Sequence, residues 1–464
     1  MNLITWVAIL GLLLGTIAPA WAQNPDSDER IQALERQLAA QRAMIAEQQA
    51  ALESMQSELN QLKSERTTAP DDDSDHVSLS DEDTGAAVEE NSALTISGFV
   101  NLDMIYDFDR VAPEYEATLV PTTIPTVPGQ YGTDGNFIVS IKQSRLAFLS
   151  EMDTPWGAAS AFIDFDLFGT GSDAGRTAFN FRNAWFELGR WGAGQTWSTF
   201  MDISTWPNVY DWWGPSAMAL NRNPQLRYTV PLDDRGSRWA VALEKQNGSF
   251  NVGIFDEIAP GLADSLRPKT ELPDLVAHWR TERDWGHVQL AGVARHLTVE
   301  SVDTEDWDVE RSEFGWGFNL TGILNVGERD QVKFGLTYGE GIASFMNDGG
   351  GSNLVPRLGA SQVQATPMKS LGYMLYYDHY WNDEWSSSIG LSQNDNELTN
   401  LQLMNEPNKV TYASANLFYT PSSYFLTGVE ALYGELETAD GSSGSDFRIQ
   451  FVTRYSFAHS LGAR

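Results

Sequence analysis

From Leu94 onward, apolar and polar side chains alternate along the chain, and this period of two limits the possible folds more than any other feature. The first alternating run, from Leu94 to Phe108, covers about fifteen residues, whereas strands of globular proteins usually have roughly five or six. Similar alternation recurs at 226–230, 239–243, 314–320, 332–338 and 371–377. Runs of this kind predict tilted strands that cross a bilayer and continue beyond it.

Short turns and long polar stretches alternate between these runs. The seven short turns are 153–156, 189–192, 233–236, 282–286, 327–330, 382–385 and 420–423. The long polar stretches include 110–136, 247–273, 347–368 and 394–408. Seven short turns alternating with eight long loops require 16 strands, and an even antiparallel count with one-sided loop lengths is typical of outer-membrane barrels. A soluble β-sandwich would also alternate, but it does not predict strands this long or loops that are long on one side only.

The fold class predicted from these patterns is all-β. We expect a 16-stranded antiparallel transmembrane β-barrel over residues 94–457, followed by a C-terminal tail of seven residues, 458–464. The last predicted strand, from Phe447 to Phe457, has aromatic or apolar residues at nearly every second position. Four of the seven short turns contain a tryptophan, which would lie in the aromatic girdle at the periplasmic interface.

Three segments precede the barrel. Residues 1–22 combine an apolar run with the cleavage signal Ala20-Trp21-Ala22, which predicts a secretory signal peptide. A membrane anchor is the alternative, but the apolar run is shorter than the roughly 20 residues that a spanning helix needs. Residues 23–66 carry five heptads and predict an α-helical coiled-coil stalk that assembles copies of the chain; a lone amphipathic helix lying on a membrane is the alternative. Residues 67–93 are acidic and predict a linker.

Composition excludes several classes of function. The net charge of −33 argues against nucleic acid as a partner, because a phosphate backbone requires a cationic surface. The chain has 0 Cys, and its 6 His do not show the spacing of metal ligands, so we expect no cofactor and no metal site. His296 and Ser301 lie near each other in sequence, but nothing orients them as a catalytic pair, so we expect that the protein is not an enzyme.

Basic residues on the predicted strands are candidates for the pore lining. Arg227 lies between Leu226 and Tyr228, so if these two face lipid, the arginine must face the lumen. The same argument, or a weaker form of it, selects Arg145, Arg182, Arg222, Arg238, Arg280, Arg295 and Lys333. A row of arginines would attract and orient small anions, since a guanidinium binds a carboxylate with two hydrogen bonds. The alternative is that these cations pair with lumen acids and brace the wall; the candidates are Asp103, Asp164, Asp166, Glu244 and Glu430.

The stretch from Phe200 to Leu220 is the strongest candidate for a functional loop. It is too aromatic to lie comfortably in bulk water, so we expect it to fold inward and narrow the channel. In this prediction Asp202 and Asp211 face the arginines, and aromatic side chains pack the loop on the wall; these are Tyr210, Trp212 and Trp213. The alternative is that the loop packs at a trimer interface.

Several motifs together make the chain similar to one family. They are Ser97-Gly98-Phe99, Ser144-Arg145-Leu146-Ala147-Phe148, Asp164-Phe165-Asp166, Arg182-Asn183-Ala184-Trp185, Gln195-Thr196-Trp197-Ser198, Asn221-Arg222-Asn223-Pro224-Gln225 and Arg227-Tyr228. With the stalk and the acidic linker, they resemble the DcaP-like trimeric outer-membrane porins. The resemblance implies a homotrimer of 16-stranded barrels that admits small organic anions, with dicarboxylates as the substrate class.

The sequence therefore predicts an outer-membrane porin for small hydrophilic solutes, with organic anions such as dicarboxylates preferred. We expect the barrel in the lipid of the bacterial outer membrane and the stalk in the periplasm, where it is a candidate for contact with peptidoglycan. Two alternatives stay open. A phosphate-selective porin would require a ladder of lysines, and a structural tether between outer membrane and cell wall would act through residues 23–93.

Overall fold

The strands of this computed structural model form one closed antiparallel barrel. The structure describes residues 92–305, 307–358 and 363–462. The predicted signal peptide, coiled-coil stalk and nearly all of the acidic linker lie outside the described residues. No helix in the described ranges has the length and apolar character needed to span a membrane.

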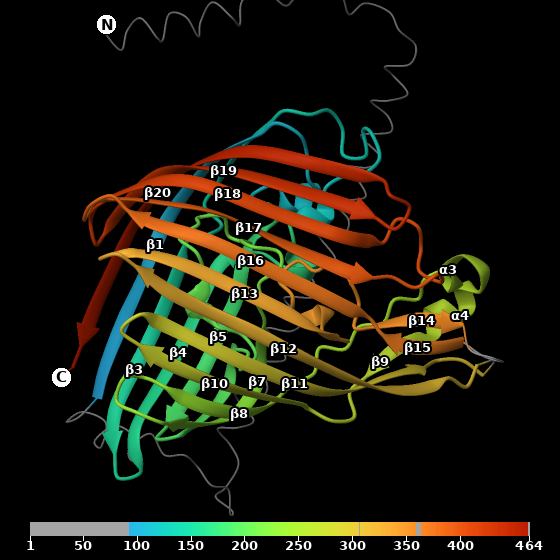
Figure 1. Ribbon diagram of the computed structural model, residues 1–464, viewed down its shortest axis with the longest axis horizontal. Coiled ribbons are helices and arrows are strands. Elements are labelled where there is room, and N and C mark those ends of the chain that lie inside the picture. The colour runs from blue at the N-terminus through green and yellow to red at the C-terminus, as the bar shows by residue number, and fades with distance from the viewer. Residues whose placement is uncertain (1–91, 306, 359–362, 463–464) are drawn as a thin grey trace, which may run out of the picture. The chain divides into compact units, whose positions relative to one another are not determined.

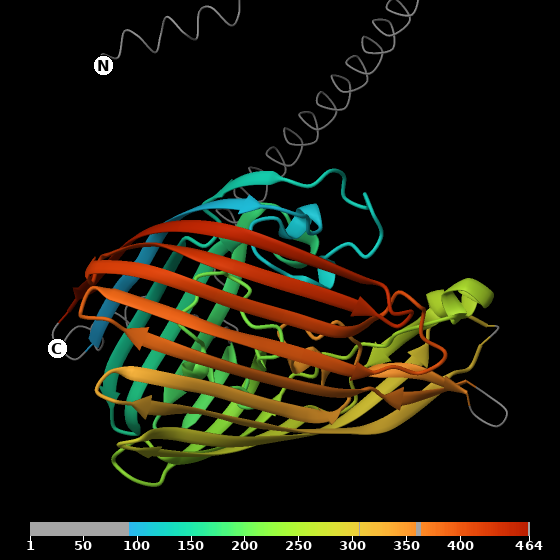
Figure 2. The ribbon, with the colours of Figure 1, turned by 45° about the horizontal axis from the view of Figure 1, so that its top comes forward.

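Sixteen strands make up the wall, and β1 pairs with β20 to close the ring, as predicted. Their bounds are β1 (Ser92–Asp107), β3 (Arg145–Thr154), β4 (Gly157–Phe168), β5 (Thr177–Leu188), β6 (Trp191–Trp197), β7 (Arg222–Pro231), β8 (Arg238–Glu244), β10 (Asp274–Arg283), β11 (Gly286–Ser301), β12 (Glu310–Val326), β13 (Asp330–Glu340), β16 (Lys369–Tyr380), β17 (Trp385–Glu397), β18 (Pro407–Ser422), β19 (Phe425–Thr438) and β20 (Ser443–Leu461). Figures 1 and 2 show these strands tilted around the barrel.

Shorter elements extend the wall or lie beyond it. Strand β2 (Asn136–Ser140) pairs with β1 in continuation of β3, and β9 (Leu266–Lys269) pairs with β11 in continuation of β10. Helices α3 (Phe255–Ile258) and α4 (Pro260–Ser265) and the hairpin β14 (Leu354–Leu358) and β15 (Val363–Pro367) project at the end with the long loops (Figure 1). The described ranges also contain five short 3-10 helices, namely η1 (Pro113–Tyr115), η2 (Pro121–Thr123), η3 (Gly171–Asp173), η4 (Ile203–Thr205) and η5 (Ala343–Phe345).

Side chains alternate between the two faces of the wall, as the period of two predicts. On β12, Phe318 and Leu320 are exposed on the outer face, whereas Asn319 and Thr321 between and beside them are buried in the interior. All seven predicted short turns connect consecutive wall strands. The start of β1 and the end of β20 lie at this short-turn end, because Leu94 pairs with Leu461.

Three boundaries differ from the predictions. Strand β20 continues to Leu461, because residues 458–461 pair with β1, so most of the predicted tail belongs to the last strand. The predicted loop 394–408 is shorter, since β17 extends to Glu397 and β18 begins at Pro407. The predicted loop 347–368 contains the hairpin β14–β15, which the sequence did not indicate because its strands are only five residues long.

Loops fill much of the barrel interior with an apolar core. Phe200 and Met201, which follow β6, pack with Ile342 and Phe345 from the loop after β13, and with Tyr376 of β16. Figure 2 shows the segment between β6 and β7 inside the ring of strands. The open interior is therefore restricted to the space that these loops leave.

Candidate functional site

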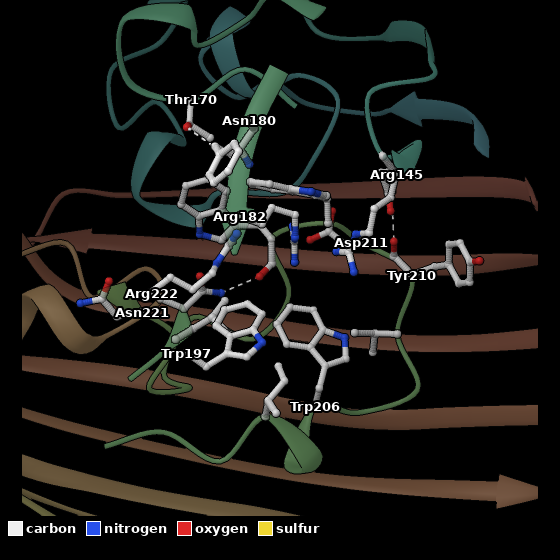
Figure 3. Close-up of a pocket in the computed structure, with 18 of the residues that line it drawn as sticks. Arg145, Thr170, Asn180, Arg182, Trp197, Trp206, Tyr210, Asp211, Asn221 and Arg222 are labelled. Carbon is white, nitrogen blue, oxygen red and sulfur yellow. Dashed lines mark hydrogen bonds between the residues drawn. The ribbon is translucent and has the colours of Figure 1, made fainter. Parts of the chain in front are cut away.

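A cavity of 760 Å³ lies between one part of the barrel wall and the loop 198–221. Four arginines line it: Arg145 on β3, Arg182 on β5, Arg222 on β7 and Arg454 on β20. Figure 3 shows the first three directed at the same space, with Trp197 and Trp206 beside them. We call this space the arginine cavity.

Two of these arginines are held by acids of β4. The Nη1 atom of Arg182 lies 2.6 Å from Asp166 Oδ2, and its Nε lies 3.4 Å from Asp164 Oδ2. Arg145 is held more loosely, with its Nε 3.7 Å from Asp164 Oδ2. Arg182 reaches this position because the pairing of β4 with β5 shifts by one residue next to it, so that Arg182 and its neighbour Asn183 are both buried.

The other two arginines contact aromatic rings and do not pair with carboxylates of the described residues. The guanidinium carbon of Arg222 lies 4.5 Å from the centre of the Trp197 ring. That of Arg454 lies 3.7 Å from the Phe99 ring and 4.2 Å from the Tyr210 ring, and its Nε donates to Asn101 Oδ1 at 3.1 Å. Among the described residues, neither arginine has a carboxylate within ion-pair distance. Their remaining N–H groups are therefore available to an anion in the cavity.

The other predicted cations do not line the arginine cavity. Three of them are paired with buried acids, namely Arg280 with Asp202 at 2.7 Å, Arg295 with Asp274 at 3.0 Å and Lys333 with Asp378 at 2.9 Å. Arg227 lies 3.3 Å from Glu187, and Arg238 donates to the backbone oxygen of Gly236 near a short turn. Four of these five cations therefore make the ion pairs that the bracing alternative describes, whereas Arg238 contacts a backbone oxygen.

Arg454 was missing from the sequence prediction, although the signal was present. Phe451 and Tyr455 of β20 face outward, so Arg454 must face inward by the same alternation that selected Arg227. Arg448 on the same strand is also buried and pairs with Asp107 and Asp446.

Asp202 attaches the start of the loop to the wall. Its carboxylate accepts hydrogen bonds from Arg280 Nη1 at 2.7 Å, His287 Nε2 at 2.7 Å and Thr321 Oγ1 at 3.2 Å. Burial alone would raise the pKa of Asp202, but the hydrogen bond from His287 and the charge of Arg280 outweigh burial and hold this pKa well below its usual range. Asp202 thus meets one predicted cation, but it does not line the arginine cavity.

Asp211 attaches the loop to a different part of the interior. Its carboxylate accepts from Thr118 Oγ1 at 2.6 Å, from Leu119 N at 3.0 Å and from Tyr412 OH at 3.2 Å. The backbone N–H of Asp211 donates to Glu430 Oε2 at 2.9 Å. Burial raises the pKa of Asp211 despite these donors. Although Asp211 borders the cavity, its carboxylate is directed to these donors, which differs from the predicted opposition to the arginines.

The aromatic residues of the loop pack against other parts of the interior. The Trp212 ring stacks on Phe168 of β4 at 4.1 Å, and its Nε1 donates to Asp166 Oδ2 at 2.9 Å. Tyr210 packs against Phe418 of β18, and Trp213 packs against Tyr115. These contacts and the two aspartates hold the loop on three sides of the interior.

The comparisons with known proteins agree with this architecture. The family model described as DcaP outer membrane protein matches residues 58–457, which is most of the chain.

The chain belongs to the DcaP outer membrane protein family.

Solved structures similar to this DcaP-family chain include the outer membrane channel DcaP of Acinetobacter baumannii, with a TM-score of 0.66 and 19% identity over 79% of this chain and 98% of that chain. The anion-selective porin from Comamonas acidovorans has a TM-score of 0.51 and 12% identity over 79% of this chain and 100% of that chain. A search of curated proteins gives no match. The family and fold place the protein in the outer membrane as a porin-type channel, as the sequence predicted.

The family and fold are those of channels and not of enzymes. The two residues considered for catalysis have other partners in this DcaP-family barrel. His296 Nε2 lies 2.9 Å from Glu271 Oε2, and the Ser301 hydroxyl donates to the backbone oxygen of Trp307 at 3.0 Å. No hydrogen bond joins His296 to Ser301 in the described part of the chain.

Replacing Asp202 with alanine should loosen the loop of this DcaP-family channel. Arg280 and His287 would lose their shared buried acceptor, and breaking such a pair costs about 3–5 kcal/mol. We expect a higher single-channel conductance and entry of larger neutral sugars in liposome-swelling assays. The matched control is Asp234→Asn, which removes an exposed carboxylate in a short turn. An unchanged conductance and size limit in Asp202→Ala would show that this anchor does not set the aperture.

Asp348 should make the stability of the loops depend on pH. It lies in the loop after β13, and its carboxylate accepts a hydrogen bond from Thr122 N at 3.0 Å. Burial raises the pKa of Asp348 to about 6 from the usual 3.8. Because the folded state binds the proton more tightly, this group stabilises the fold below pH about 4, and the contribution disappears as the pH rises through about 6.

The effect is measured by urea unfolding at pH 7 and pH 4.5 in wild type and in Asp348→Asn. The wild type should gain on the order of 1–3 kcal/mol at the lower pH relative to the variant, which has no proton to bind at this position. Parallel pH profiles of the two proteins would contradict the assignment.

Proposed function

We propose that the protein is a passive porin for small hydrophilic solutes and that it favours organic anions with carboxylate groups, such as dicarboxylates. The observation that carries this proposal is the presence of Arg222 and Arg454, two guanidinium groups without carboxylate partners, in one cavity. A carboxylate accepts two parallel hydrogen bonds from a guanidinium, and two such groups suit a solute with two carboxylates.

The charge balance of the cavity supports an anion preference. Among the described residues, four arginines and a single acid line it, and that acid, Asp211, already accepts three hydrogen bonds from Thr118, Leu119 and Tyr412. The net charge of the whole chain is −33, but the field inside a narrow cavity depends mainly on the charges that line it. The carboxylates of Asp164 and Asp166 neutralise part of the positive charge of Arg145 and Arg182. They also fix the positions of these two guanidinium groups.

We propose further that loop 198–221 forms the constriction of the channel. Its anchors at Asp202 and Asp211 lie on different parts of the wall, so the segment between them must cross the interior. Trp206 and Tyr210 of this segment face the same cavity as the arginines. A solute would therefore pass between arginines on one side and aromatic rings on the other.

A homotrimer with a periplasmic stalk is part of the proposal. The heptads of residues 31–62 favour association of copies of the chain. The barrel begins at the short-turn end, where Leu94 pairs with Leu461, and short turns face the periplasm in outer-membrane barrels. A stalk joined to this end would lie in the periplasm, the compartment that contains peptidoglycan.

The proposal is tested by recording single channels of the purified protein in planar bilayers under a salt gradient. We expect closures in three steps, a reversal potential that indicates anion preference, and concentration-dependent block by a dicarboxylate such as succinate. Stronger block by inorganic phosphate than by succinate would favour the phosphate-selective alternative. Absence of conductance would favour the structural tether, which would lose cell-wall association when residues 23–93 are deleted.

A further inference from the structure

The barrel wall is incomplete beside the arginine cavity. Strand β5 pairs with β4 along most of its length, from Leu188 to Thr177, but it pairs with β6 only from Leu188 to Ala184. Among the described residues, no strand pairs with 177–183 on the β6 side. The side chain of Gln195 partly compensates, because its Nε2 donates to the backbone oxygen of Arg182 at 3.0 Å.

Strand β6, which lies next to β5, is also too short to complete the wall. It has 7 residues, whereas β11 and β18 have 16. A strand needs about 9–11 residues to cross the hydrocarbon core. The gap therefore begins at a depth where lipid tails would otherwise meet the unpaired edge of β5, and lipid tails cannot satisfy backbone N–H and C=O groups.

The gap adjoins the proposed site. Phe181 and Arg182 of β5 border the arginine cavity on one side of the gap. Trp197 of β6 and Arg222 of β7 border it on the other side. Beside the gap, the residues Phe179 and Phe181 of β5 are 76% and 54% exposed. An unpaired polar edge between exposed aromatic rings suits a protein surface better than acyl chains.

We propose that a second copy of this chain covers the gap between β5 and β6 and completes the wall of the arginine cavity. The inference rests on the proposed homotrimer and adds which face of the barrel is covered. The occupant is a second copy because the heptads of residues 31–62 would bring copies of this same chain together. Each barrel would keep its own pore, and the wall of its arginine cavity would be completed by the neighbouring copy.

The test is photo-crosslinking of the full-length purified protein in liposomes of one synthetic phospholipid. Phe179 is replaced by p-benzoylphenylalanine, and Phe181 is replaced in a second variant. The matched control is Phe318 on β12, which is 55% exposed on the outer face, far along the sheet from β5. Folding of each variant is checked by its heat-modifiable electrophoretic mobility.

We expect the probe at Phe179 or Phe181 to give a product of twice the chain mass, and the probe at Phe318 to give a phospholipid adduct. Phospholipid adducts at all three positions, or crosslinks only within one chain, would overturn the inference. The channel recordings separate this outcome from failure of the proposed function. Three-step closures combined with lipid adducts at Phe179 would place the interface on another face, while the porin proposal would stand.

Discussion

Replacing Arg222 and Arg454 together with glutamine should remove the anion preference of the channel and most of its affinity for dicarboxylates. Each arginine has free N–H groups and no carboxylate partner, so neither substitution leaves a buried acid unpaired. A hydrogen bond to a charged group contributes about 1.5–3 kcal/mol, so each substitution should weaken the block by a dicarboxylate roughly 10- to 100-fold. The reversal potential and the concentration dependence of block in planar bilayers measure both effects.

Two controls separate this effect from a general loss of charge. The double variant with lysine at both positions keeps the positive charge but loses the planar guanidinium that can form two hydrogen bonds to one carboxylate. Anion preference should therefore persist while the dicarboxylate block weakens. Arg238→Gln removes one positive charge outside the arginine cavity and should leave the block unchanged. If Arg238→Gln and the double glutamine variant changed the block equally, the cavity would not be the binding site.

The wall could be predicted from the sequence because two local signals determine it. Alternation of side chains specifies which residues form long strands, and turn residues specify where the chain reverses at the short-turn end. Both signals are lost where a strand is interrupted. The break between β2 and β3 at 141–144 depends on the pairing of both strands with β1, and the strands of the hairpin β14–β15 have only five residues each, which is too few to show a clear period.

The site could be predicted only in part, for a related reason. Alternation shows that an arginine faces inward, but the register with the next strand decides which acid it meets. Arg295 meets Asp274 because β10 and β11 are paired with Leu275 opposite Ala294, and the sequence alone does not contain that register. Arg182 depends on a shift in the pairing of β4 and β5, which alternation cannot anticipate. The loop was predicted as an inward segment from its aromatic residues, but its donors and acceptors come from remote parts of the chain.

Replacing Arg295 with methionine should have the largest effect on stability. The guanidinium is fully buried, and its Nη2 lies 3.0 Å from Asp274 Oδ2, which is equally buried. Its Nη1 also donates to the backbone oxygen of Gly341 at 2.6 Å and to Asn353 Oδ1 at 3.0 Å, so one side chain joins β10, β11 and the loop after β13. Methionine would leave the Asp274 charge buried without a cationic partner, with only the hydrogen bond from Gln246 remaining among the described residues, and breaking a buried pair in this way costs about 3–5 kcal/mol.

The loss is measured as the shift in the midpoint of urea unfolding, followed by tryptophan fluorescence. An exposed ion pair provides the control. Arg235→Gln removes the partner of Asp284, and both side chains are mostly exposed. Such surface pairs contribute only about 0–1 kcal/mol to the free energy of unfolding. The double variant Asp274→Asn with Arg295→Met should recover part of the loss, since it no longer buries an unpaired charge. If Arg295→Met unfolded at the same urea concentration as Arg235→Gln, Arg295 would not brace the wall, and its role would have to lie in the solute path.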